Sequence, residues 1–233
     1  RMAAVVDQHV RTQGDDIVVP QLNNLIAAVG MCGATAPYEA RLVAPSLRRT
    51  NPYYITPLEL GIVPGIHSMA SFHPDSPIPL DVNETLNAEN SGNPALAEQH
   101  TVVVFLADGV QNPVTGKIMT VHANITLAQL LGAWAFSSLT LPDALPVGEF
   151  AVVGARLVAA SACAFRFVPV GAAHRPGGIP VPSVGGDDNW YQRYGRMGEW
   201  FTFNTVNPPG VEVLSSAAVA SATYDMYIDM IAK

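Results

Sequence analysis

Charged side chains are scarce in this sequence. Only 13% of its 233 residues are charged, against about 25% in an ordinary soluble domain. Lysine is nearly missing, at Lys117 and Lys233 alone, and the densest basic cluster is the pair Arg48 and Arg49. A nucleic-acid-binding protein needs a basic patch or arm that faces the phosphates. Because the formal net charge is −7, we do not expect direct, sequence-specific binding to nucleic acid.

Cysteines and long apolar runs are also scarce. Cys32 and Cys163 have neither a CxxC nor a metal-ligand spacing, so we expect two buried free thiols and no disulfide framework. No apolar run approaches the roughly 18 residues of a transmembrane helix. The first residues lack the apolar core of a signal peptide. The numbering opens on arginine and not on methionine. Whether residues precede it, and whether the protein is exported, therefore stay open questions.

Familiar catalytic and cofactor motifs are missing from the sequence. It contains no G-x-S-x-G elbow, P-loop, GxGxxG, HExxH or EF-hand loop. His67, His73 and Asp75 lie near one another, but Pro74 interrupts them and no third metal ligand is evident, so we expect exposed loop histidines. The sequence predicts neither an enzyme nor a bound cofactor or metal.

The apolar character of the chain points to self-association. Hydrophobic residues make up 49% of the sequence, and the segments that resemble loops are apolar as well. Solubility usually relies on a charged surface, so such a chain would be a poor free monomer. We expect much of the surface to be buried against other copies. A large core beneath a neutral polar surface is the alternative.

Many short β-strands are predicted along the chain. Glycine and proline, at 19 residues each, are spread throughout and leave little room for long helices. Runs rich in Val, Ile, Phe and Thr between these breaks are typical of strands. The clearest runs are Thr101–Asp108, Lys117–Leu127, Gly132–Leu141, Phe150–Val158, Ala162–Val168, Glu199–Val206, Val211–Leu214 and Thr223–Ile231.

The first part of the chain is less regular. Strands are expected at Asp16–Pro20, Glu39–Val43, Tyr53–Thr56 and Ile66–Phe72. Pro20–Val29 fits either a strand or a short helix, and Ser71–Asn93 has the polar, proline-rich composition of a long connection.

One short motif occurs twice, half a chain apart. Residues 39–46 are EARLVAPS and residues 154–161 are GARLVAAS, and each is followed by a Pro-Gly loop. We predict that Ala40–Ala44 and Ala155–Ala159 occupy the same strand of two similar domains. The expected fold is all-β, with two tandem barrels or sandwiches of roughly eight short strands each, few short helices, and domains at 1–110 and 111–233.

Several residues are candidates for structural or interface roles. Arg41 and Arg156 stand in the repeated motif, and Arg166 lies in another apolar run. A buried arginine needs a polar partner, so we expect each to pair with a carboxylate or a carbonyl. An acidic group, Asp187–Asn189, precedes Trp190 and Tyr191 and could bind calcium or a sugar. A solvated loop with an aromatic anchor is the expected alternative.

The second half of the chain resembles a known family. The likeness lies in LPVGEFAVVGAR (145–156), Phe165 and Arg166, HRPG (174–177, which contains Arg175), YGRMGEW (194–200) and PPGVEVL (208–214). These residues resemble the coat proteins of small tailless icosahedral viruses, bacteriophages in particular. The chain is similar to the double jelly-roll major capsid class, in which two β-barrels lie side by side in one chain.

The resemblance implies a specific biology. Such proteins form trimers whose six barrels make a pseudo-hexameric tile of an icosahedral shell. The expected partners are other copies and neighbouring capsid subunits, with minor capsid proteins or an internal membrane as further contacts. The expected location is the virion, after assembly in the host cytoplasm.

The length of the chain departs from this family. A chain of 233 residues is short for a double jelly roll, so either the loops are trimmed or one barrel carries extensions. The alternative function is a carbohydrate- or receptor-binding β-sandwich, such as a spike module. A cupin-type enzyme would need histidines that converge in one barrel, and His122 and the other histidines are too scattered for that.

Overall fold

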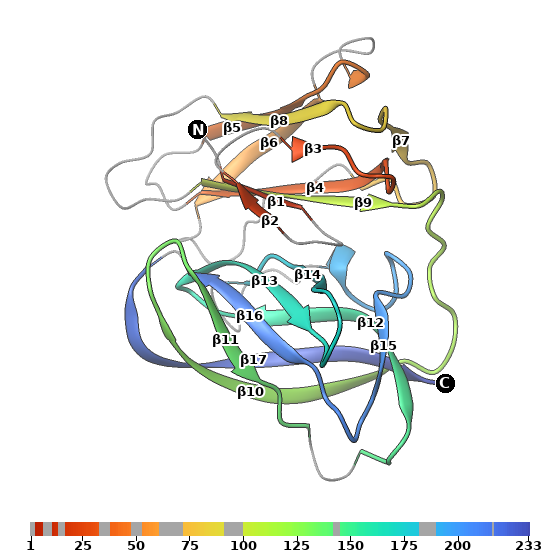
Figure 1. Ribbon diagram of the computed structural model, residues 1–233, viewed down its shortest axis with the longest axis vertical. Coiled ribbons are helices and arrows are strands. Elements are labelled where there is room, and N and C mark those ends of the chain that lie inside the picture. Colours follow the sequence, from red (N-terminus) through yellow and green to blue (C-terminus); the bar gives the residue numbers. More distant parts are fainter. Residues whose placement is uncertain are drawn as a thin grey trace. The chain divides into compact units, whose positions relative to one another are not determined.

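β-Strands form nearly all of the regular structure in the computed structural model (Figure 1). The structure describes residues 3–6, 11–13, 17–32, 38–47, 53–60, 72–90, 100–141, 145–181, 190–215 and 217–233. These residues contain no α-helix, and a 3-10 helix, η2, covers Trp190–Gln192. The all-β class predicted from the sequence is confirmed.

In the described ranges no helix has the length and the apolar character to cross a membrane.

The chain divides into two units, Arg1–Gln111 and Asn112–Lys233. The boundary expected between residues 110 and 111 lies one residue before this division. The strands of the first unit are β1 (Ala3–Val6), β2 (Arg11–Gln13), β3 (Ile17–Val18), β4 (Asn24–Cys32), β5 (Tyr38–Val43), β6 (Tyr53–Leu60), β7 (Ile78–Pro79), β8 (Thr85–Asn90) and β9 (His100–Ala107).

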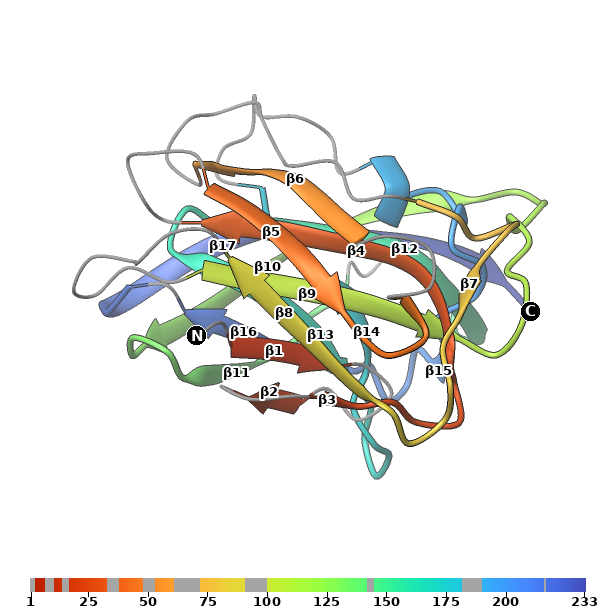
Figure 2. The ribbon, with the colours of Figure 1, turned by 90° about the horizontal axis from the view of Figure 1, so that it is seen from above.

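The first unit is a curled sheet that folds into two layers. Its strand order is β2-β1-β9-β4-β6-β5-β8-β3, with β7 paired to β4. Figure 2 shows β4 and β9 side by side in one layer and β5 and β8 in the other. The layers enclose a core of buried aliphatic residues, which are Val19, Leu25, Ala28, Leu42, Ala44, Leu47, Leu80, Leu86, Val102 and Val104.

The second unit is built from two four-stranded sheets. Its strands are β10 (Met119–Gln129), β11 (Trp134–Ser138), β12 (Glu149–Val158), β13 (Ala162–Val168), β14 (Arg175–Gly178), β15 (Phe201–Asn204), β16 (Gly210–Ser215) and β17 (Val219–Ala232). One sheet has the order β10-β17-β12-β15, and the other has the order β11-β16-β13-β14.

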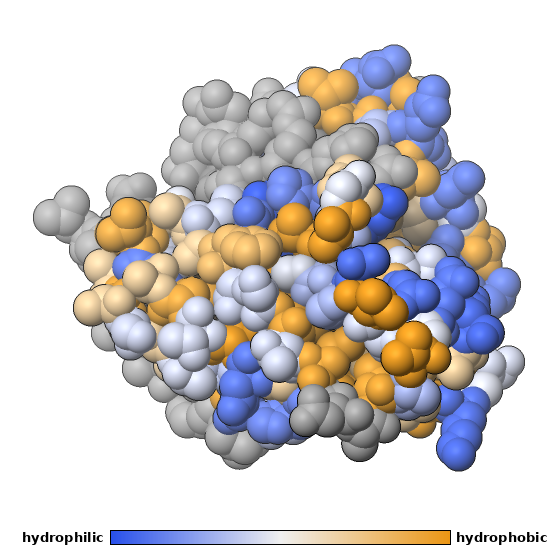
Figure 3. Space-filling view, turned by 60° about the horizontal axis from the view of Figure 1, so that its bottom comes forward, coloured by the Kyte–Doolittle hydropathy of each residue, from blue (hydrophilic) through white to orange (hydrophobic). Residues whose placement is uncertain are grey.

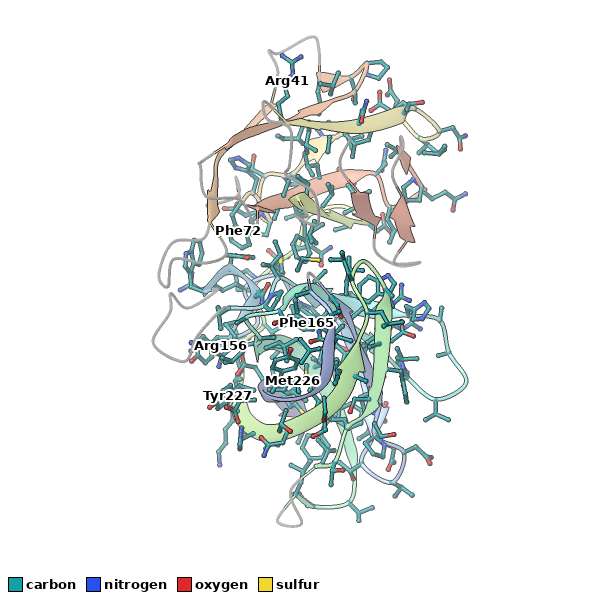
Figure 4. The ribbon with its side chains drawn as sticks, turned by 90° about the vertical axis from the view of Figure 1, so that its left-hand side faces the viewer. Arg41, Phe72, Arg156, Phe165, Met226 and Tyr227 are labelled. Atoms are coloured by element: carbon teal, nitrogen blue, oxygen red, sulfur yellow. The ribbon has the colours of Figure 1, made fainter. Side chains whose placement is uncertain are left out.

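The core of the second unit lies between its two sheets. Alternation along β10 buries Val121, Ala123, Ile125 and Leu127 and exposes the residues between them, as a strand with one solvated face requires. Phe165 and Met226 point into this core from opposite sheets (Figure 4). Aromatic rings supply much of the remaining volume, from Phe150, Phe167, Phe201 and Phe203.

The two units share one scheme of strand pairing. The last strand of each unit, β9 or β17, pairs with β4 in the first unit and with β12 in the second. The strand before it, β8 or β16, pairs with β5 in the first unit and with β13 in the second. The pairs β5–β6, β4–β7 and β3–β8 recur as β13–β14, β12–β15 and β11–β16, all antiparallel. Three features differ. The strand β1 runs parallel to β9 whereas β10 runs antiparallel to β17, β1 also pairs with β2, and β4 also meets β6.

This scheme overturns the expected role of the repeated motif. Ala40 to Val43 lie in β5, which pairs with β6 and β8, whereas Ala155 to Val158 lie in β12, which pairs with β15 and β17. By pairing, β5 corresponds to β13 and not to β12. The prediction that both motifs occupy the same strand is therefore wrong. The same Arg-Leu-Val run has two half-buried residues in β5 and one in β12, so it does not identify a position in the fold.

Some strands were missed from the sequence. The stretch Pro20–Val29 is not helical, since β4 begins at Asn24. The expected connection Ser71–Asn93 contains β7 and β8, and the Pro-Gly loop contains β14. The strand β8 has a polar sequence because Leu86 is its one fully buried residue among those with a described side chain. Most of the expected strand Ile66–Phe72 falls outside the described residues.

Because β14 has the sequence RPGG, its composition is typical of a loop. A Cβ atom on Gly177 would lie 1.9 Å from the carbonyl oxygen of Phe165 on the neighbouring strand. Glycine is thus required here by close backbone approach, which is a recognised use of glycine in strands.

Candidate functional site

Arg166 belongs to a polar cluster on the sheet β11-β16-β13-β14. Its Nε lies 2.5 Å from Oε2 of Glu212, the residue opposite it on β16, and its guanidinium lies 4.1 Å from the ring centroid of Trp134. His174 Nε2 lies 3.4 Å from the same glutamate oxygen. Arg166 is buried, and pairing is what a buried charge requires.

His174 has the least ordinary electrostatic surroundings in this cluster. Burial lowers the pKa of His174, the positive charge of Arg166 lowers it further, and the negative charge of Glu212 raises it by less. The imidazole is therefore harder to protonate than a free histidine.

The other candidate arginines, Arg41, Arg156 and Arg175, are half-buried. Arg41 is opposite Glu89 in the pairing of β5 with β8. Arg156 is opposite Tyr227 in the pairing of β12 with β17, and Figure 4 shows these two side chains together on the outside of the unit. Arg175 begins β14. Arg41 and Arg156 do not occupy equivalent positions, because their strands do not correspond.

Trp190 and Tyr191 do not form an exposed aromatic platform. Tyr191 is buried and its ring meets Trp190 edge-on at 6.1 Å, while the Arg196 guanidinium lies 4.8 Å from the Trp190 ring centroid. Burial raises the pKa of the Tyr191 hydroxyl. The acidic pair Asp187 and Asp188, and Asn189 after it, lie outside the described part of the chain. The aromatic anchor is present, but Tyr191 is not available to a sugar.

Gln192 closes the open edge between the two sheets. Its Nε2 donates to the carbonyl oxygens of Ala155 (3.2 Å) and Ile179 (2.9 Å), and its Oε1 accepts the Ile179 amide at 3.1 Å. These contacts join β12 to the segment that follows β14. A Cβ atom on Gly178 would lie 2.1 Å from Gln192 Oε1, so this glycine leaves the space that the side chain fills.

Arg193 and Asp229 hold the next turn against the outer face of β12 and β17. The Asp229 carboxylate accepts from Arg193 Nε at 2.6 Å and Nη2 at 3.0 Å, from the Tyr194 amide at 3.0 Å and from the Thr120 hydroxyl at 2.7 Å. This buried group was missed from the sequence. Its signal is an aspartate among apolar residues in YIDMI (227–231), which calls for a cationic partner.

One end of the second unit exposes apolar loops. In antiparallel sheets the connections β11–β12, β13–β14 and β15–β16 emerge at the same end, and they carry Val147, Val170 and Val206. These valines are 81%, 74% and 65% exposed. Thr205 ties two of the loops together, because its amide donates to the Gly148 oxygen and its hydroxyl accepts the Gly148 amide, both at 3.0 Å.

A shallow depression lies beside these loops. Its lining is almost wholly uncharged and comprises Leu139, Thr140, Leu141, Leu145, Val147, Thr205 and Pro208. Figure 3 brings the lower part of the view forward and shows apolar side chains (orange) spread between polar ones. We call Leu141, Leu145, Val147, Val206 and Pro208 the loop-end patch.

The outer face of β10 and β17 carries a row of polar and aromatic side chains. His122 Nε2 lies 2.9 Å from Asp225 Oδ1, and the His122 ring is 5.0 Å from that of Tyr227. The hydroxyls of Thr126 and Thr223 are 3.0 Å apart. His122 and Asp225 are both well exposed to solvent.

The candidate metal ligands that the structure describes do not come together. Within the described ranges no three His, Cys, Asp or Glu side chains converge as metal ligands. His73 is half-buried and Asp75 exposed, while His67 lies outside those ranges. Cys163 is a buried free thiol. Cys32 lies in β4, and its side chain is not among those described.

Comparison with known proteins gives no relative. No family model matches the chain, and neither a curated protein nor a solved structure matches it significantly. The function must therefore be argued from the pairing scheme and from the surfaces.

Proposed function

We propose that this protein is a structural subunit of the double jelly-roll capsid type that self-associates into an icosahedral shell. The observation that carries the proposal is the pairing scheme. A jelly roll arranges roughly eight strands in two sheets through two Greek keys. The second unit places eight strands in the two sheets β10-β17-β12-β15 and β11-β16-β13-β14, which supports the proposal. The sets β1-β9-β4-β7 and β3-β8-β5-β6 of the first unit pair in the same order, but β1 runs parallel to β9 and both sets belong to one sheet, in which β4 also pairs with β6.

The surface of the second unit supports self-association. Val147 and Val206 of the loop-end patch, and Val170 near it, expose large apolar side chains, and exposed apolar surface of this kind supports a contact site. Large obligate interfaces resemble a domain core cut in half and need few ion pairs. A chain with 13% charged residues suits such interfaces. The proposed partners are other copies in a trimer and neighbouring capsid subunits, with minor capsid proteins or an internal membrane as further contacts.

The proposed role needs no chemistry at a catalytic centre. The polar groups that the structure brings together are used to hold loops in place, as with Gln192 and the pair of Arg193 and Asp229. The proposed location is the virion, after assembly in the host cytoplasm.

Particle formation is the direct test. Full-length protein at micromolar concentration should sediment as trimers or larger species, and negative-stain electron microscopy should show tiles or closed shells. Protein that stays monomeric under all buffer conditions, with no particles on the grid, would overturn the proposal.

A carbohydrate- or receptor-binding module is the second candidate. The observation that favours it is the exposed row of His122, Asp225 and Tyr227, because sugar sites combine an aromatic ring with hydrogen-bonding neighbours. A monomeric protein that binds glycans on an array, and loses this binding with Tyr227→Ala but not with Thr126→Ala, would support the module in place of the shell.

A further inference from the structure

The strand β10 forms one edge of the sheet β10-β17-β12-β15 (Figure 1). On one side it pairs with β17 from Met119 to Gln129. On its other side no segment of the described ranges makes a backbone hydrogen bond with residues 119–127. Such an edge presents a row of free N–H and C=O groups, to which a further strand can bond.

We propose that the free edge of β10 pairs with β10 of a second copy, antiparallel and across a two-fold axis at Ala123. The two sheets then continue as one sheet across the contact. In a shell this contact would join neighbouring subunits, and that meaning rests on the proposed function, whereas the pairing itself does not.

The other described edge strands are short. In the first unit β2, β3 and β7 have three, two and two residues, and in the second β11, β14 and β15 have five, four and four. The strand β14 also contains Pro176, which has no N–H to donate. Natural sheets protect their edges in these ways, or with charged side chains, because a bare edge recruits other chains.

The strand β10 has none of these protections. It is 11 residues long, and its sequence MTVHANITLAQ contains no proline and no Asp, Glu, Lys or Arg. The nearest charged residue, Lys117, precedes the strand. A long, uncharged edge is what strand addition from another chain requires.

The extent of the regular edge selects the register. A bulge between Leu127 and Gln129 ends the regular part of the strand, which leaves residues 119–127. Two antiparallel copies of this stretch overlap completely only when the pair is centred on its middle residue, Ala123. A two-fold axis there gives both copies the same contact, so each satisfies the free edge of the other. The full overlap would form about eight to ten backbone hydrogen bonds.

The side chains of the two copies match in this register. Side chains alternate along β10 between the exposed and the buried face, and the register places exposed beside exposed and buried beside buried. No pair brings like charges together, which would oppose pairing. The opposed residues are Thr120 with Thr126, Val121 with Ile125, His122 with Asn124, and Met119 with Leu127.

The contact is small on its own. One strand edge buries little surface, and interfaces of low area form weak, transient contacts. Little ordering opposes the pairing, because β17 already holds β10 along its length. We therefore expect dimers that form and separate rapidly at micromolar concentration, and that become stable where a second surface, such as the loop-end patch, also holds the copies together.

Disulfide cross-linking of two full-length variants tests the pairing. One carries His122→Cys and the other Asn124→Cys, both at exposed positions. Directly opposed residues of a strand pair fall within the Cα distance of a disulfide, about 4.4–6.8 Å, whereas diagonal residues, at about 7–8 Å, do not. Under mild oxidation the mixture should give cross-linked dimers at least about tenfold faster than either variant alone, because pairing raises the effective concentration of the opposed thiols.

A third variant supplies the matched control. Thr202→Cys places a thiol at an exposed residue of β15, the edge strand at the other end of the same sheet. Its mixture with Asn124→Cys should cross-link slowly, and the wild type gives the background from Cys32 and Cys163. The pairing is overturned if the first mixture links no faster than these controls, or if one edge variant alone links faster than the mixture.

Sedimentation separates the pairing from the shell. Fast cross-linking in a protein that forms neither trimers nor particles would uphold the pairing and contradict the proposed function. Particles whose edge thiols link at the control rate would uphold the shell and contradict the pairing.

A charge on the edge gives a second readout. Asn124→Lys adds the side chain by which natural edges prevent strand addition, and Thr202→Lys is its control on β15. Loss of species larger than trimers with Asn124→Lys, but not with Thr202→Lys, supports both the pairing and the shell. Large species that form equally well with both lysine variants would contradict the pairing.

Discussion

Arg193 and Asp229 form a two-point ion pair inside the second unit, 36 residues apart in the chain. Their side chains are 5% and 0% exposed. Every lone-pair direction of the carboxylate is used, since the Tyr194 amide and the Thr120 hydroxyl also donate to it. This pair fastens the turn after η2 to the strands β10 and β17.

Removing the carboxylate charge should be costly. Asp229→Asn leaves the Arg193 charge buried, and breaking a buried pair in this way costs on the order of 3–5 kcal/mol in the free energy of unfolding. Asp225→Asn on the same strand is the matched control, because its partner His122 is exposed and such pairs are worth less than about 1 kcal/mol. Urea denaturation measures both. Equal stability of the two variants would show that the pair contributes nothing.

The second prediction concerns the close packing of Gly154 against the same turn. A Cβ atom on Gly154 would lie 2.8 Å from the Gln192 carbonyl oxygen and 2.9 Å from Arg193 Cα, both backbone atoms that cannot rotate away. Gly154→Ala should destabilise the protein by about 1–3 kcal/mol through overpacking.

Gly148→Ala provides its control. There the added Cβ would meet the Phe150 ring at 3.8 Å, an ordinary contact, and stability should change little. Thermal unfolding of the two variants gives the comparison, and a Gly154 variant that melts with wild type would refute the tight fit.

Two tyrosines, Tyr191 (buried) and Tyr224 (half-buried), should respond oppositely to loss of the hydroxyl. The Tyr191 hydroxyl is buried with no hydrogen-bond partner among the described residues, so Tyr191→Phe removes an unsatisfied polar group and should be neutral or stabilising. The Tyr224 hydroxyl donates to Gln129 Oε1, so Tyr224→Phe should cost about 1 kcal/mol. The denaturant midpoints of these two variants and of the wild type measure the difference in stability. A Tyr191 variant less stable than the Tyr224 variant would indicate a partner for Tyr191.

The sequence was most informative where a strand has a simple environment. The alternation of His122, Asn124 and Thr126 with Val121, Ala123 and Ile125 reflects one wet and one dry face, and it predicts β10 well. The continuous apolar run of β12 predicts a strand covered on both faces. Strands with many backbone contacts and few large side chains, such as β14 with Gly177 and Gly178, give no such pattern.

The sequence alone does not identify which carboxylate pairs with a buried arginine. A buried arginine in β13 predicts a carboxylate, but only the register of β13 with β16 selects Glu212 among the acidic residues. The repeated ARLVA motif shows that similar residues can lie in strands that do not correspond, since one copy lies in β5 and the other in β12. The recurrence that the structure does show lies in the pairing of strands, and sequences with little in common can satisfy the same pairing.

The last prediction concerns the surface through which we propose that copies associate. Val147→Asp combined with Val206→Asp places two charges in the loop-end patch, which desolvation would penalise heavily in an apolar contact. Self-association should be lost at micromolar concentration while the fold is retained.

The double variant Val82→Asp and Val110→Asp is its matched control. It adds the same charge at valines that are 44% and 54% exposed in the first unit, so association should persist. Wild-type protein should also remain associated in about 1 M NaCl, where the Debye length is about 3 Å, because screening acts on charges and hardly on apolar burial. Sedimentation velocity gives all these measurements. Equal dissociation of both double variants would show that net charge, and not the loop-end patch, controls association, and dissociation of the wild type in salt would mean that ion pairs hold the subunits together.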